Sequence, residues 1–172
     1  MPGFAAKIET RSVWVLNSLI YSLQSLLISR GGTPEERQDN IQQIIDRQKQ
    51  VESDPRFPPI CVYAEGTQSN GEYLLTFKKG AFAGLNTVQP VVMKYNWKGF
   101  SPTWEGMPFI CHGALMLMHL GYYTCEVHVL PDFKPNDHLF ENHSDKGEEQ
   151  WEVYAWAVRD VMAKFGGFKL CD

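Results

Sequence analysis

Short apolar runs predict four β-strands, at residues 23–29, 60–63, 88–93 and 125–130. Prolines, glycines and charged residues flank these runs, which is typical of strands buried in a sheet. The run at 88–93 would form a strand beside 60–63. Pro90 lies inside it and predicts a bulge or an edge position, because proline cannot donate a hydrogen bond to a neighbouring strand.

The segment Thr33-Pro34-Glu35-Glu36 predicts the start of a helix, since it combines a hydroxyl N-cap, a proline at the first helical position and two acids. Prolines from residue 55 onward would end this helix. Its Arg, Gln and Lys face would be exposed, whereas a stripe at helical spacing would pack on the sheet. The stripe consists of Ile41, Ile44, Ile45, Gln48 and Val51.

A closing helix is predicted at 148–165, and Gly166-Gly167 would stop it. One apolar face of this helix comprises Trp151, Tyr154, Ala155, Val158, Met162 and Phe165. The preceding residues, 132–147, are expected to be a polar loop. Near the other end of the chain, residues 12–29 are expected to form a short helix that turns into the first strand.

Residues 95–104 form an aromatic-rich segment, expected to be a loop, and 107–123 follow as an apolar segment interrupted by His112 and His119. Aromatic side chains beside an apolar helix suit a membrane surface. An ordinary core helix with hydrogen-bonded histidines at its rim fits the same pattern. The two histidines are seven residues apart on one helix face. Without a third ligand, this spacing is only weak evidence for a metal-binding site.

Helices alternating with strands predict an α/β fold with a mixed β-sheet flanked by helices. The chain of 172 residues, with 44% hydrophobic content, is long enough for one domain, with an N-terminal extension at 1–11, a core at 12–165 and a tail at 166–172. The net charge of −4 lacks the basic excess that is typical of proteins that bind nucleic acid. The four cysteines lack metal-ligand spacing and are expected to be reduced thiols of an intracellular protein.

Residues 60–94 contain three blocks with possible chemistry: Glu65-Gly66-Thr67 with Ser69-Asn70-Gly71, then the segment 77–82 around Lys78-Lys79-Gly80, then Val88-Gln89-Pro90-Val91. In this order and spacing they resemble the glycerolipid acyltransferases, closest to the lysophosphatidylcholine acyltransferase branch. Similarity extends to 103–106, 126–131 and 157–159, and so covers roughly residues 16–165. Ala64 departs from the proline common before the glutamate in that family.

The resemblance implies a truncated glycerol-phosphate acyltransferase fold and a site for the phosphate of an acceptor lipid. The residues it assigns to this site are Arg30, Glu65, Gly66, Thr67, Ser69, Lys78 and Lys79. The chemistry is sensible, because guanidinium and ammonium groups match phosphate oxygens and glycine lets the backbone approach an anion. From the residues alone, Arg30 could instead be a surface arginine that closes a strand. Glu65 could instead accept hydrogen bonds from the N–H groups of its own loop.

The family's catalytic pair is a His followed after four residues by an Asp, upstream of the segment matching 23–30, and this sequence has no His before His112. Of the five histidines, only His143 has a carboxylate five positions later, Glu148, and it lies in the polar loop. No catalytic residue is therefore assigned. Because the general base is missing, we expect a degenerate, inactive acyltransferase-like protein rather than an enzyme.

Such a protein would be a lipid-binding or structural subunit of a larger complex at an intracellular membrane, with the mitochondrial membrane as one location. Its expected partners are a phospholipid or lysophospholipid, the membrane surface and other proteins. The alternative is that the sequence is part of a longer, active lysophospholipid acyltransferase. No metal or cofactor is expected, and acyl-CoA would be a co-substrate only in the active alternative.

Overall fold

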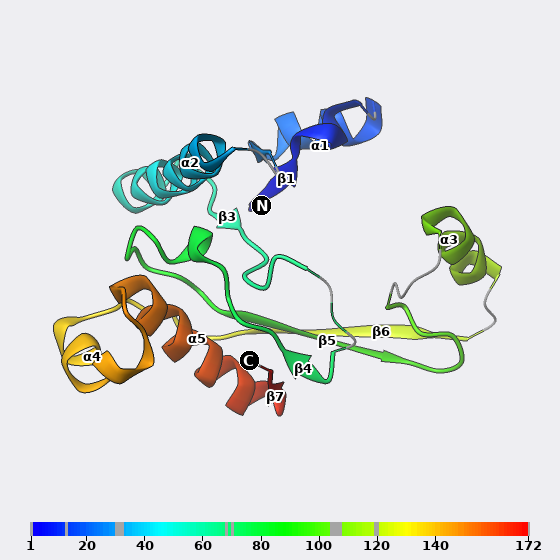
Figure 1. Ribbon diagram of the computed structural model, residues 1–172. Coiled ribbons are helices and arrows are strands. Elements are labelled where there is room, and N and C mark those ends of the chain that lie inside the picture. Colours follow the sequence, from blue (N-terminus) through cyan, green and yellow to red (C-terminus); the bar gives the residue numbers. More distant parts are fainter. Residues whose placement is uncertain are drawn as a thin grey trace.

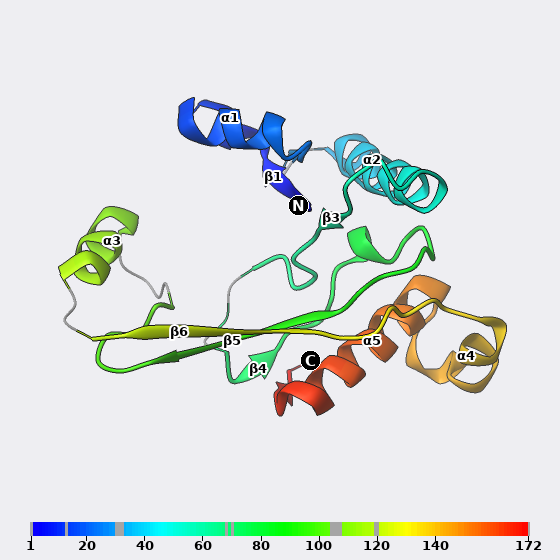
Figure 2. The same cartoon turned by 180° about the vertical axis from the view of Figure 1, so that it is seen from behind.

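The computed structural model describes residues 2–12, 14–29, 33–67, 69, 71–103, 108–118 and 121–171. Its helices are α1 (Trp14–Ser22), α2 (Pro34–Ser53), α3 (Phe109–Met118), α4 (Asp137–Asn142) and α5 (Gln150–Gly166), with short 3₁₀ turns η1 (Ile8–Ser12), η2 (Lys79–Ala81) and η3 (Ser144–Lys146) (Figure 1). The strands are β1 (Gly3–Lys7), β2 (Leu26–Ile28), β3 (Ile60–Cys61), β4 (Tyr73–Leu74), β5 (Val91–Trp97), β6 (Tyr123–Val129) and β7 (Lys169–Leu170). Helices α1 and α2 lie with β1 on one side of the long β5–β6 hairpin, and α4 and α5 lie on the other (Figures 1 and 2).

The α/β class with both parallel and antiparallel strand pairs is confirmed, but the described strands are divided among small sheets instead of one mixed sheet. The order β2-β1-β3 forms a parallel sheet, β4 and β7 form a parallel pair, and β5 and β6 form an antiparallel pair. Strand pairing depends on distant segments, which is why the local apolar pattern identified strands without identifying their partners.

The N-terminal segment supplies the middle strand of the first sheet, so the boundary expected after residue 11 does not separate an extension from the core. Gly3 donates its N–H to Pro59 O at 2.8 Å, and the N–H of Phe4 donates to the Ser25 hydroxyl at 3.0 Å. A Cβ at Gly3 would lie 2.7 Å from Leu23 O, so only glycine permits this close approach. The 166–172 tail likewise contributes a strand, β7.

Helix α2 begins as predicted. The Thr33 hydroxyl accepts a hydrogen bond from the N–H of Glu36, and the Glu36 carboxylate accepts one from the N–H of Thr33, which is a capping box. Ile44 is buried, as the stripe predicted, but the expectation of an exposed Arg, Gln and Lys face was wrong at Arg47. Arg47 is buried, and its guanidinium donates to Gln24 O at 2.6 Å, two residues after the end of α1.

The hairpin β5–β6 corrects the prediction for residues 88–104. Strand β5 begins after Pro90 and continues to Trp97, so residues 95–97 belong to a strand and not to a loop, and β5 pairs with β6 rather than β3. Val88 makes a separate bridge to Phe133, with N–H···O distances of 3.0 and 2.7 Å. Proline at position 90 cannot donate to a partner, and its carbonyl instead accepts from Leu130 N at 2.9 Å.

Helix α5 forms the centre of the core. Tyr154 is fully buried, with its ring edge-on to the Phe82 ring at a centroid distance of 5.3 Å. The predicted end of the helix at Gly166-Gly167 is confirmed, because Gly167 adopts φ +69° as the C-cap. Phe165, which was assigned to the same apolar face as Tyr154, is 49% exposed. The expected loop 132–147 contains α4 and η3, because the Asn136 side chain caps α4 by accepting from the N–H of Leu139.

Arg159 links α5 to the short sheet β4–β7. It is buried, and its guanidinium donates to Leu74 O at 2.8 Å and to Cys171 O. These bonds satisfy carbonyl groups of two strands that are far apart in sequence. Arg159 therefore has a structural role at the C-terminal end of the chain.

Helix α3 is shorter than the predicted segment 107–123, of which residues 107, 119 and 120 lie outside the described residues. Its position does not fit an ordinary core helix, because Ile110 is 83% and Leu117 90% exposed. His112, by contrast, is buried, with its ring 5.4 Å from the Phe100 ring. Among the helices that the structure describes, none has the length and apolar character required to cross a membrane.

Candidate functional site

The Glu-Gly-Thr turn follows β3, as predicted from the apolar run that precedes it. The N–H of Gly66 donates to Tyr63 O at 3.0 Å, which closes the turn. Gly66 has φ +69°, a left-handed conformation that favours glycine, and a Cβ there would lie 3.3 Å from Lys78 Cγ. This glycine therefore allows the turn and Lys78 to lie against each other.

Glu65 holds the turn to the segment that follows β4. Its Oε2 accepts a hydrogen bond from the N–H of Leu75 at 2.9 Å, and the N–H of Lys78 donates to Ala64 O at 2.7 Å. This agrees with the alternative in which the carboxylate accepts backbone N–H groups, although the donor lies ten residues away and not within the turn itself. Glu65 thus fixes the position of Lys78 beside Gly66.

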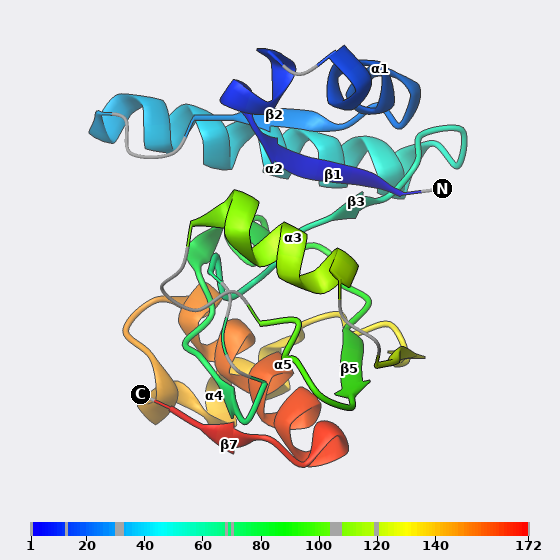
Figure 3. The same ribbon diagram turned by 90° about the vertical axis from the view of Figure 1, so that its right-hand side faces the viewer.

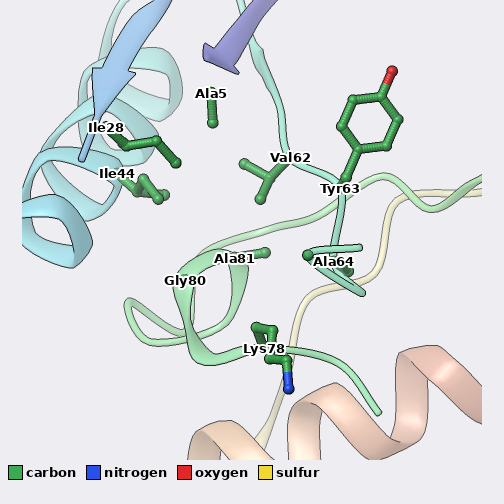
Figure 4. A pocket seen from close by; sticks show the side chains of 10 residues that line it. Ala5, Ile28, Ile44, Val62, Tyr63, Ala64, Lys78, Gly80 and Ala81 are labelled. Carbon is green, nitrogen blue, oxygen red and sulfur yellow. The ribbon is translucent and has the colours of Figure 1, made fainter. Parts of the chain in front are cut away.

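An apolar cavity of about 160 Å³ opens beside the turn. Figure 4 shows the side chains of Ala5, Ile28, Ile44 and Val62 gathered around it, from β1, β2, α2 and the segment after β3. Lys78 also lines the cavity, and its ammonium group points away from these apolar side chains (Figure 4). The cavity therefore has an apolar interior, with the Lys78 side chain at its border and the ammonium group directed outward.

The other site residues predicted from the resemblance are dispersed. Lys79 points to the N-terminal end of α5, where its ammonium lies 2.9 Å from a Glu149 carboxylate oxygen and 5.4 Å from the centre of the Trp151 ring. The hydrogen bond from Lys79 lowers the pKa of Glu149, which favours the charged carboxylate. Among the predicted residues that the structure describes, Lys78 and Gly66 line the cavity and Lys79 does not.

Ser69, Thr67 and Arg30 complete the predicted set. The Ser69 hydroxyl donates to Tyr73 O at 3.3 Å and accepts from the N–H of Gly71 at 3.4 Å, so it stabilises the turn before β4. Thr67 is exposed to solvent. Arg30 lies outside the described residues, so its predicted contact with phosphate stays a prediction.

Sequence reasoning did not find the apolar wall of the cavity. Ala5 was assigned to an extension, and Ile28 and Val62 were considered only as members of strands. Ile44 was expected to pack on the sheet, which gave a partial signal. These residues come from four separate segments, and only the tertiary structure places them around one space.

The described residues contain no cluster of three or more His, Cys, Asp or Glu side chains positioned to hold a metal ion. His143, considered as a substitute base, lies at the end of α4 with its ring 5.1 Å from the Trp156 ring. His119, the second member of the weak histidine pair, lies outside the described residues. We assign no metal or catalytic role to these histidines.

Comparison with known proteins gives consistent similarities. The family model described as Acyltransferase matches residues 1–94. A lysophosphatidylcholine acyltransferase of Drosophila melanogaster is 33% identical, with 99% of this chain and 30% of the relative aligned. Lysophosphatidylcholine acyltransferase 2 of Homo sapiens is also 33% identical, over 100% of this chain and 30% of the relative.

The lysophospholipid acyltransferase LPEAT1 of Arabidopsis thaliana is 28% identical, over 99% of this chain and 41% of its own length. The chain therefore spans roughly a third of the length of these curated relatives. No solved structure matches the chain.

Proposed function

Because the chain belongs to the glycerolipid acyltransferase family, in the branch that resembles the lysophosphatidylcholine acyltransferases, we propose that it binds a lysophospholipid at the cavity beside the Glu-Gly-Thr turn. The observation that carries the proposal is the apolar cavity with Lys78 among its lining residues and the Lys78 ammonium directed outward from it. A lysophospholipid combines the same two chemical features, an apolar chain and an anionic phosphate.

The size of the cavity limits what it would hold. Sites for whole drug-sized ligands usually enclose about 300–1,000 Å³, whereas this cavity has about 160 Å³. We therefore assign it the part of the lipid nearest the glycerol, with the rest of the acyl chain outside. The phosphate would lie at Lys78, whose ammonium is a suitable donor to phosphate oxygens.

We propose a non-catalytic role for the 172 residues themselves. Acyl transfer to a hydroxyl needs a general base, and loss of such a base typically reduces the rate by about 10²–10⁴-fold. The sequence has no His before His112, and the described histidines do not line the cavity. The chain would then serve as a lipid-binding accessory subunit of a membrane-associated complex.

A second candidate is that these residues form the acceptor-binding part of an active lysophospholipid acyltransferase. It is favoured by the curated relatives, whose names state this activity and which align with the whole chain. In that case acyl-CoA would be the co-substrate. The test is to incubate the 172-residue chain with acyl-CoA and lysophosphatidylcholine. Release of free CoA from acyl-CoA would support activity within these residues and overturn the accessory role.

Adjacent lysines provide a matched test of the lipid site. Calorimetry with lysophosphatidylcholine below its micelle concentration should show that Lys78→Ala weakens binding about five- to tenfold, a loss of about 1–1.4 kcal/mol. Lys79→Ala should bind within about twofold of wild type, because the Lys79 ammonium pairs with Glu149. Equal losses in both variants, or no binding by the wild-type chain, would refute the assignment.

A further inference from the structure

A second cavity, of about 340 Å³, lies along α5. Its volume is within the range of about 300–1,000 Å³ that is usual for ligand sites. We call it the α5 cavity, and it is lined by Thr76, Phe77, Lys146, Trp151, Glu152, Ala155, Trp156 and Arg159. Three aromatic rings, one carboxylate and two cationic groups therefore border one space outside the cavity beside the Glu-Gly-Thr turn.

One short segment lines both cavities. Figure 3 shows α1, α2 and β1 at one end of the molecule and α4 and α5 at the other. Gly80 and Ala81 line the first cavity, which α2 also lines, whereas Thr76 and Phe77 line the α5 cavity. Lys78 lies between these two pairs in the sequence, and in Figure 4 its ammonium group is directed toward the side on which α5 lies. A phosphate at Lys78 would therefore lie between the two cavities.

The two indole rings of the α5 cavity already face ammonium groups. The Lys146 ammonium lies 5.6 Å from the centre of the Trp156 ring, and the Lys79 ammonium lies 5.4 Å from the centre of the Trp151 ring. The Lys146 ammonium also pairs with an Asp145 carboxylate oxygen at 2.8 Å. The face of an aromatic ring attracts a cation, and these contacts show that one face of each indole is accessible to an ammonium group.

The chain beside the α5 cavity is acidic, since residues 145–152 contain four carboxylates and one lysine. Among these, Glu152 lines the cavity, and its Oε2 accepts the N–H of Glu148 at 2.7 Å and the N–H of Glu149 at 3.2 Å. These hydrogen bonds hold the carboxylate in place. The buried Arg159 also lines the cavity, and its guanidinium donates to Leu74 O. The lining thus carries charges of both signs, which suits a zwitterionic ligand.

We propose that the α5 cavity recognises the ammonium end of a zwitterionic lysophospholipid headgroup, and that Trp151, Glu152 and Trp156 select it. This inference rests on the proposed function, which places the phosphate at Lys78. From there the headgroup extends toward α5, so its ammonium meets the indole faces and the Glu152 carboxylate. A headgroup without a positive charge gains neither contact.

Calorimetry with two lysophospholipids of the same acyl chain tests the inference. Lysophosphatidylcholine and lysophosphatidylglycerol carry the same phosphodiester charge, and only the first has an ammonium group. Below the micelle concentrations, the wild-type chain should bind lysophosphatidylcholine about three- to tenfold more tightly, as expected for a cation against an aromatic face. Trp156→Leu should abolish this preference by weakening lysophosphatidylcholine alone, and Trp156→Phe should keep most of it. Trp97→Leu, at an exposed tryptophan of β5, is the matched control and should bind like wild type.

Lys146→Ala distinguishes a cation site from an anion site. It removes the ammonium that lies over the Trp156 ring, so lysophosphatidylcholine should bind at least as tightly as to wild type. A loss of more than about threefold would assign the α5 cavity to an anion and overturn the proposal. Lysophosphatidylethanolamine shows which ammonium is taken: binding like lysophosphatidylcholine supports a site for both headgroups, and binding like lysophosphatidylglycerol supports a site for choline alone.

Two results would overturn the headgroup site. These are equal binding of lysophosphatidylcholine and lysophosphatidylglycerol by the wild-type chain, and equal losses for both lipids in Trp156→Leu, which would indicate a structural role. The first result needs no variant and holds even if a variant fails to fold. In either case the proposed function stands if Lys78→Ala still weakens both lipids. Failure of the wild-type chain to bind either lipid would overturn the proposed function and, with it, this inference.

Discussion

Substitution of Glu65 tests whether the carboxylate of the Glu-Gly-Thr turn stabilises the folded protein. Its carboxylate accepts the N–H of Leu75 at 2.9 Å, and this bond joins the turn to the segment carrying Lys78. In Glu65→Ala the N–H of Leu75 would lose its acceptor. In Glu65→Gln the amide oxygen can still accept the bond, although without a charge.

The cost follows from the environment of this bond. Hydrogen bonds to charged groups are worth about 1.5–3 kcal/mol when buried, and both residues are only half-buried. We therefore expect Glu65→Ala to lower the free energy of unfolding by about 1–2 kcal/mol, and Glu65→Gln to lower it by less than about 1 kcal/mol. Leu75 should also exchange its amide hydrogen faster in Glu65→Ala.

Urea unfolding measures this difference. With an m-value of about 2 kcal/mol per M, the midpoint for Glu65→Ala should fall by about 0.5–1 M at unchanged m. Glu141→Ala, at an exposed glutamate of α4, is the control and should shift the free energy by less than about 0.5 kcal/mol. A midpoint for Glu65→Ala equal to that of the control would refute the structural role, as would equal losses in the alanine and glutamine variants.

Three further predictions concern other buried or paired groups. Tyr154→Phe removes a hydroxyl 2.9 Å from Asn86 O and should lower the melting temperature by about 2–8 °C, because a buried carbonyl loses a donor; an unchanged melting temperature would contradict this. Burial raises the pKa of the Cys61 thiol, so iodoacetamide should label it more slowly than the three exposed cysteines, as peptide mass spectrometry would show, and equal rates would be the opposing result. The hydrogen bond from the N–H of Thr87 lowers the pKa of Glu52 below its ordinary 4.5. The difference in the free energy of unfolding between wild type and Glu52→Ala should therefore be largest above pH 4.5 and should disappear as the pH falls further. A difference that persists in acid would count against this prediction.

The sequence by itself determined the features whose physical causes are local. The N-cap at Thr33 and the glycine stop at Gly167 each depend on contacts within a few residues, so their positions could be predicted. The α/β class followed from the alternation of apolar patterns. The family was recognisable because its motif blocks are contiguous in sequence, from Glu65 to Val91.

Only the tertiary structure decided which distant groups meet. It placed Leu75 against Glu65, turned Lys79 toward Glu149 and left Lys78 at the cavity. It also set the face of β5 that packs on α5. An alternating strand has two faces, and the local pattern alone suggests that the apolar one is buried. Here the register with β6 and the packing of α5 left the apolar face outward, because those contacts form between segments that are far apart in the sequence.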